Sequence, residues 1–132
     1  MIYTPETLAE FQILLTAFHE YIQTSPYFEI LFSPRQGFLF LLIEGETLEI
    51  QRIATPDDLF RWLIDEISSD VRDLFLCGEH ISVHLFPAEI DETRKRMLPY
   101  IARLPETQRE HYTAQMEEYF RRCNNRSEFS RE

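Results

Sequence analysis

The chain has 132 residues and carries 23 acidic against 13 basic side chains, a formal charge of −10 at pH 7. Apolar residues make up 44% of the sequence and aromatic residues 14%, which excludes the polar, aromatic-poor class of disordered chains. The excess of acidic groups argues against a nucleic-acid or membrane partner, because phosphate and anionic lipid both require a basic surface.

The first predicted element is an amphipathic helix near the N-terminus. Thr4 is a suitable N-cap, and Pro5 suits the first helical position. Ser25-Pro26 ends the helix. Between these signals, apolar residues recur at three- and four-residue steps, the pattern of a helix with one buried side: Leu8, Phe11, Leu15, Phe18 and Ile22.

Three β-strands are predicted next, over residues 27–32, 38–43 and 47–53. A two-residue turn connects the last two strands, and glycine at its first position, Gly45, suits the type II′ geometry of tight hairpins. Residues 33–37 form a longer turn between the first two strands. These signals predict an antiparallel meander.

The expected register of this meander gives a sheet with two apolar faces. Pairing Phe32 with Phe38 places one apolar set together: Phe28, Ile30, Phe32, Phe38, Phe40 and Leu42. The opposite face carries a second set: Leu31, Leu39, Leu41, Ile43, Leu48 and Ile50. Each face needs a cover, since a sheet with a wet side normally has polar residues there. We expect the first two helices to cover one face. The C-terminal helices are favoured over a second chain for the other, because four helices offer enough apolar surface.

A helix that begins at Pro56 and a second hairpin are predicted after the meander. The hairpin has strands at 74–77 and 80–85 around a Gly78-Glu79 turn, with the apolar residues of both strands on one face. The sheet would then contain about five strands.

Two helices are predicted in the C-terminal part, over residues 87–98 and 105–122, with Pro99 expected to break or kink the first. Residues 124–132 are polar and are expected to form a flexible tail. The sequence therefore predicts a single α+β domain over residues 1–123. Its element order is α-β-β-β-α-β-β-α-α.

Neither a signal peptide nor a membrane span is expected from this sequence. The N-terminal residues lack the basic start and the continuous apolar stretch of a signal peptide. The longest apolar run, residues 38–43, is far shorter than the roughly 20 residues that span a membrane. Cys77 and Cys123 do not form a disulfide framework and are expected to be free thiols. A cytoplasmic protein is the expectation.

The only cluster of metal-ligating residue types comprises Cys77, His80 and His84. In the predicted hairpin, His84 lies roughly 13 Å along the strand from His80. Three ligands so arranged cannot share one zinc ion at bond lengths of about 2.0–2.3 Å. A nucleophile formed by Cys77 with His80 has no recognisable orienting group or oxyanion donor. No metal, cofactor or catalytic residue is therefore predicted, and an activity as an enzyme is disfavoured.

Acidic residues are concentrated in the first two-thirds of the chain. Residues 1–88 contain fourteen acids and four bases, whereas residues 89–132 contain nine of each. Such a surface would suit a basic segment of a protein partner, although a solvated face that maintains solubility is the simpler and favoured interpretation. The partner-binding residues that the first interpretation predicts are Glu44, Glu46, Glu49, Asp57, Asp58, Asp65 and Glu66.

Two functions stay open at this point. The favoured one is a protein–protein interaction module that acts through its sheet face or its acidic surface, with a homodimer as one form of it. The alternative is a small-ligand-binding protein or enzyme with a pocket between the aromatic sheet face and the helices. In that case Phe28, Phe40 and Trp62 would be pocket walls rather than core.

Overall fold

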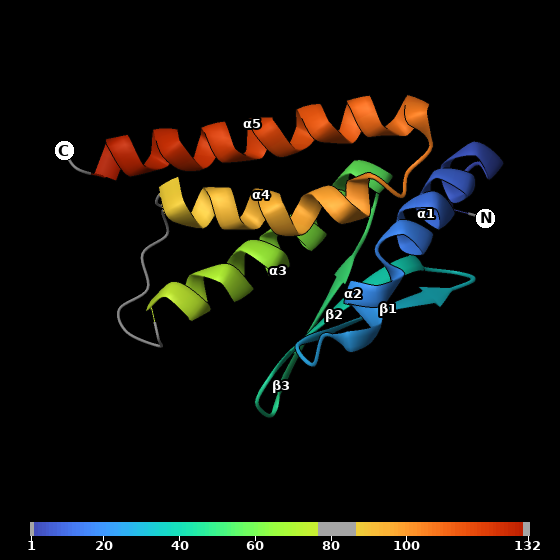
Figure 1. The fold of residues 1–132 in the computed structure, drawn as a ribbon. Coiled ribbons are helices and arrows are strands. Elements are labelled where there is room, and N and C mark those ends of the chain that lie inside the picture. Colours follow the sequence, from blue (N-terminus) through green and yellow to red (C-terminus); the bar gives the residue numbers. More distant parts are fainter. Residues whose placement is uncertain (1, 77–86, 131–132) are drawn as a thin grey trace. The chain divides into compact units, whose positions relative to one another are not determined.

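The structure is a computed structural model that describes residues 2–76 and 87–130 (Figure 1). By internal contacts the chain divides into two compact units, one up to Arg61 and one from Trp62 onward. In chain order the elements are α1 (Pro5–Ala17), α2 (His19–Thr24), β1 (Phe28–Ser33), β2 (Gly37–Glu44), β3 (Thr47–Arg52), α3 (Pro56–Leu76), α4 (Pro87–Ile101) and α5 (Glu106–Ser130).

The fold is α+β, but the predicted five-stranded sheet and the predicted element order are wrong. The described residues form one three-stranded antiparallel sheet in the order β1-β2-β3, together with five helices. One difference lies in the N-terminal helix, which is divided into α1 and α2. At Phe18 the backbone has φ −98° and ψ 10°, outside the helical range, although the apolar spacing continues through it. Apolar periodicity alone does not reveal such a local change in the backbone.

The larger difference is α3, which includes the residues up to Leu76 that were expected to begin a second hairpin. Leu74 and Leu76 alternate as in a strand. However, Leu74 also continues the helical spacing of Ile67 and Val71, and extending an existing helix requires no new nucleus. The rest of the predicted hairpin, residues 77–86, lies outside the described residues.

The meander in the first unit has the predicted register. Phe28 lies opposite Leu42 in the β1–β2 pair, and Ile50 lies opposite Leu41 in the β2–β3 pair. Gly45 has a φ of +60°, the positive value that tight hairpin turns require at this position. The alternating pattern and the turn residues together were sufficient to predict this part of the fold.

Two helices cover the first face of this sheet. Phe11 of α1 lies with its ring centroid 4.7 Å from that of Phe38, and the ring centroid of Tyr21 of α2 lies 5.8 Å from that of Phe28. Phe28 and Phe40 stack on each other at 4.9 Å. The four phenylalanines are buried, so this aromatic layer is the core of the first unit.

Tyr3 fastens the N-terminal segment to the sheet. Its hydroxyl donates to the carbonyl oxygen of Ile53 and accepts from the backbone N–H of Phe38, at 2.9 Å for the latter. Directly after it, the Thr4 hydroxyl accepts from the N–H of Thr7 at 3.1 Å and caps α1, which confirms the predicted helix start. The Tyr3 hydroxyl thereby satisfies two backbone groups far apart in the sequence.

In the second unit, α4 and α5 lie side by side (Figure 1). Pro99 lies inside α4, which continues to Ile101, so this proline does not end the helix. Apolar side chains buried on these two helices include Met97, Met116 and Phe120. The helical backbone of α5 extends to Ser130. The single domain and the flexible tail over 124–132 stay predictions.

No helix in the described ranges, 2–76 and 87–130, is both long and apolar enough to cross a membrane.

Candidate functional site

The second face of the sheet is apolar and open. We call it the open face and define it by the six side chains that strand alternation and register place together: Leu31, Leu39, Leu41, Ile43, Leu48 and Ile50. Leu31, Leu48 and Ile50 expose 47%, 54% and 58% of their surface, and the other three are half-buried. Within the described first unit, α1 and α2 pack on the opposite face. The cover that was expected from the C-terminal helices belongs to the second unit and stays a prediction.

The exposure of these side chains has an energetic consequence. Fully burying one aliphatic side chain of this size stabilises a complex by about 1.5–3 kcal/mol, so covering the half that is exposed is worth on the order of 1 kcal/mol. Leu31, Leu48 and Ile50 together offer roughly 3 kcal/mol on this basis. Large contiguous apolar patches on folded proteins are typical of interaction sites, whereas singly exposed apolar side chains are ordinary.

Two charged residues, Glu29 and Arg52, share the open face. Glu29 lies opposite Leu41 from β1, and Arg52 lies opposite Leu39 from β3. Both are exposed, and neither forms an ion pair within the described residues; the Arg52 guanidinium donates to the side-chain oxygen of Gln36. Sequence reasoning missed both residues, although the predicted register already placed them on this face.

Two of the acidic residues expected to bind a partner, Glu44 and Glu49, do not lie on the open face. Glu44 and Glu49 pair with Thr47 and Leu42, which places both carboxylates on the first-face side of the sheet. Glu46 lies in the hairpin turn and is exposed. A partner at the open face therefore does not meet the carboxylates of Glu44 and Glu49.

The other four expected acids lie on α3. Asp57 and Asp58 are exposed in its first turn, where the Thr55 hydroxyl accepts from the Asp58 N–H at 3.1 Å, so the predicted cap is confirmed. Asp65 and Glu66 belong to the second unit, exposed and half-buried respectively. Partner binding by these acids stays a prediction.

A polar cluster joins α3 to α5 in the second unit. The buried Ser68 hydroxyl donates to the backbone carbonyl of Asp65 and lies 3.0 Å from the Tyr119 hydroxyl. Burial, and next the charge of Asp65, raise the pKa of Tyr119 well above its ordinary value. Tyr119 therefore stays protonated at neutral pH. The Ser68–Tyr119 contact joins α3 to α5 within the second unit.

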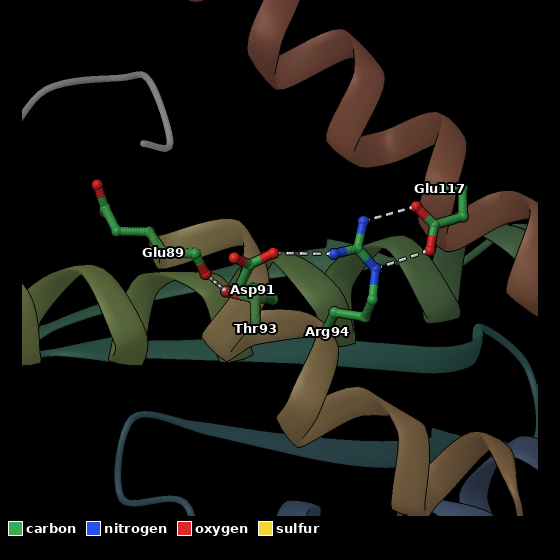
Figure 2. A network of polar contacts seen from close by, with 5 residues as sticks. All are labelled: Glu89, Asp91, Thr93, Arg94 and Glu117. Atoms are coloured by element: carbon green, nitrogen blue, oxygen red, sulfur yellow. Dashed lines mark hydrogen bonds and ion pairs between the residues drawn. The ribbon is translucent and has the colours of Figure 1, made fainter. Parts of the chain in front are cut away.

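A second polar network joins α4 to α5 (Figure 2). Arg94 donates two hydrogen bonds to the Glu117 carboxylate, at 2.9 and 2.8 Å, and a third to Asp91 at 3.3 Å. Its guanidinium also lies 5.0 Å from the ring centroid of Phe120. In Figure 2 the Glu89 side chain points away from this network. The two-point contact fixes the helix pair in one register.

Replacing Glu117 with glutamine is expected to lower the free energy of unfolding by about 0.5–1 kcal/mol at pH 7, since the pair is partly exposed to solvent. Hydrogen bonds from Arg94 lower the pKa of Glu117 below its ordinary value of 4.5. Its stabilising effect is therefore complete above that value and is lost as the pH falls below it. Urea unfolding at pH 7 and at pH 3 measures the difference. The matched control is Glu110→Gln, an exposed residue of the same helix; an equal loss in both variants would contradict the expectation.

The weak metal-ligand candidates Cys77, His80 and His84 lie outside the described residues. Among residues 2–76 and 87–130, no group of three or more histidine, cysteine or acidic side chains is arranged to hold a metal ion. Cys123 is buried on α5.

The aromatic walls expected for a ligand pocket are part of the core. Phe28 and Phe40 are 1% and 0% exposed, and each fills the space against the other's ring. Trp62 is half-buried and belongs to the second unit. Phe28 and Phe40 therefore belong to the core of the first unit, and a ligand pocket between the aromatic sheet face and the helices stays a prediction.

Comparison of the chain with protein-family models, with curated proteins and with solved structures finds no match in any of the three. A functional proposal therefore depends on the geometry and chemistry of the chain itself.

Proposed function

We propose that the chain is a small, acidic protein–protein interaction module of the cytoplasm, and that the open face is its binding surface. One observation carries the proposal: six apolar side chains share this face, and Leu31, Leu48 and Ile50 are about half exposed. The centre of a protein–protein interface is apolar and poor in charge, which is the composition of this face.

The predicted acidic residues would have a secondary role in partner binding. An exposed ion pair contributes about 0–1 kcal/mol and weakens with salt. Covering the open face releases more free energy and is not screened by salt. Glu44, Glu46 and Glu49 would therefore steer a partner towards the module rather than hold it.

A photo-crosslinking amino acid in the native host tests the proposal. Placed at position 50, on the open face, it is expected to form covalent adducts with a protein. Placed at Gln51, the next residue of the same exposed strand and on the opposite side of the sheet, it is expected to form few or none. Equal adducts at both positions, or none at position 50, would contradict the proposal.

Charge substitution at the same two positions provides a matched control. Ile50→Asp and Gln51→Asp both change an exposed residue of β3, so both are expected to alter the free energy of unfolding by less than about 1 kcal/mol. Only Ile50→Asp should abolish the complex, because it alone introduces a charge that the partner must desolvate. Loss of the complex in both variants would indicate a different surface.

A further inference from the structure

We propose that the occupant of the open face is a second copy of this chain, packed face to face about a two-fold axis parallel to the strands. The inference rests on the proposed function, since it takes the open face as the binding surface. Three features of the described first unit carry it: the local charge of the face, the positions of its two charged residues, and the absence of ion-pair partners for either.

The open face is locally neutral in a strongly acidic chain. A net charge of −10 opposes association of two copies wherever their acidic surfaces meet. The hairpin carboxylates of Glu44 and Glu49, however, lie on the other side of the sheet. Among the paired residues of the three strands, this face holds one acid, Glu29, and one base, Arg52, so two copies can meet over the strands without a charge barrier.

The two charged residues lie on opposite edge strands of the three-stranded sheet, Glu29 on β1 and Arg52 on β3. A two-fold axis parallel to the strands places β1 of one copy over β3 of the other. Glu29, Leu41 and Ile50 form one row across the sheet, so Glu29 would lie over Ile50 of the second copy. Arg52 of that copy lies two residues further along, roughly 7 Å away, which is within reach of an arginine side chain.

The symmetry makes this pairing occur twice. Each Glu29 meets an Arg52 of the other copy, and the apolar residues of the two faces meet between the two ion pairs. Such an isologous contact closes on itself and leaves no further surface for growth. Two sheets packed in this way form an ordinary aligned β-sandwich contact.

Other occupants of the open face would not pair both of its charged residues. A basic segment would find only Glu29 and would confront Arg52. A neutral apolar segment would cover both charges without pairing either, which costs desolvation energy. Stacking two copies about an axis across the strands would instead place β1 over β1 and β3 over β3, so each Glu29 would face the strand that carries the other Glu29.

Charge reversal and mixing test the inference. Glu29→Arg alone and Arg52→Glu alone each place like charges together twice in the dimer. Each is therefore expected to raise the dimer dissociation constant at least about tenfold, measured by sedimentation velocity on the full chain. An equimolar mixture of the two variants is expected to restore dimers, because each mixed dimer regains both opposite-charge pairs. The double variant should also dimerise.

Two controls accompany this experiment. Glu49→Arg changes an exposed acid on β3 that lies on the other side of the sheet, and it should leave the dissociation constant unchanged. Ile50→Asp should abolish the dimer while keeping the helical circular-dichroism signal and the thermal midpoint of the monomer. Sensitivity to Glu49→Arg would indicate pairing along the β3 edge and would overturn the inference.

The remaining outcomes separate this inference from the proposed function. A wild-type chain that stays monomeric while position 50 crosslinks to a different protein overturns the second copy and leaves the interaction module standing. A monomer in which position 50 crosslinks only to residues 62–132 of its own chain overturns both. A dimer that the two variants do not regain on mixing overturns the face-to-face pairing.

Discussion

Replacing Phe40 with alanine is expected to lower the free energy of unfolding by about 3–5 kcal/mol, the range for removing a buried aromatic ring. Phe40 lies on the central strand of the meander, is 0% exposed and stacks on Phe28. Its neighbours on both sides are strands held by ladder hydrogen bonds, so the backbone cannot collapse into the cavity. A loss of this size is a large fraction of the stability of a small protein, about 5–15 kcal/mol.

The adjacent residue provides the control for this prediction. Leu41 follows Phe40 on the same strand but lies on the open face and is half-buried. Leu41→Ala is expected to cost about 1 kcal/mol, less than half the effect of Phe40→Ala. Both are measured by urea unfolding at a dilution where the chain is monomeric. An equal loss of unfolding free energy in Phe40→Ala and Leu41→Ala would mean that the two faces of the sheet are equally covered within one chain.

Replacing Gly37 with alanine is expected to cost about 3 kcal/mol, because two effects add. Gly37 has a φ of +83°, where any residue with a β-carbon is strained by about 1–2 kcal/mol. A β-carbon there would also lie 2.5 Å from the Tyr3 hydroxyl oxygen. Tyr3 would have to move, which breaks its hydrogen bonds to Ile53 and Phe38. Leaving such buried backbone groups unsatisfied costs about 1–3 kcal/mol.

Gly45 separates these two effects. Its φ of +60° is also positive, but no atom lies within 4 Å of the position of an added β-carbon. Gly45→Ala should therefore cost about 1–2 kcal/mol from backbone strain alone. If the larger cost at Gly37 acts through Tyr3, the double variant Gly37→Ala with Tyr3→Phe should lose less stability than the sum of the single variants. Equal costs at the two glycines would contradict this account.

The sequence was most informative where short-range chemistry decides the outcome. Thr4 and Thr55 cap the helices that they were expected to cap, and Gly45 adopts the positive φ that its turn needs. Strand alternation has a period of two, so a register error would have moved a whole set of apolar residues to the wrong face. The pairing of Phe28 with Leu42 follows from that constraint.

The sequence was ambiguous where two periodicities fit the same residues. Leu74 and Leu76 alternate like a strand, while Leu74 equally continues the helical stripe of Val71. The helix takes these residues because extending it adds one hydrogen bond per residue without a new nucleus. At Phe18 the apolar spacing was misleading in a different way, because it is continuous there although the helical backbone is interrupted.

The sequence by itself determined that the sheet has two apolar faces, but only the tertiary structure decided which face of the first unit its own helices cover. Six apolar residues lie on each face, so hydrophobicity alone does not choose between them. The first face is covered because its phenylalanines pack against rings from α1 and α2, with Phe11 on Phe38 and Tyr21 on Phe28. The open face offers aliphatic side chains instead. The strand register places the two charged residues of the proposed dimer contact on the open face, Glu29 on β1 and Arg52 on β3. Their lack of ion-pair partners within the described residues depends instead on how the rest of the first unit packs.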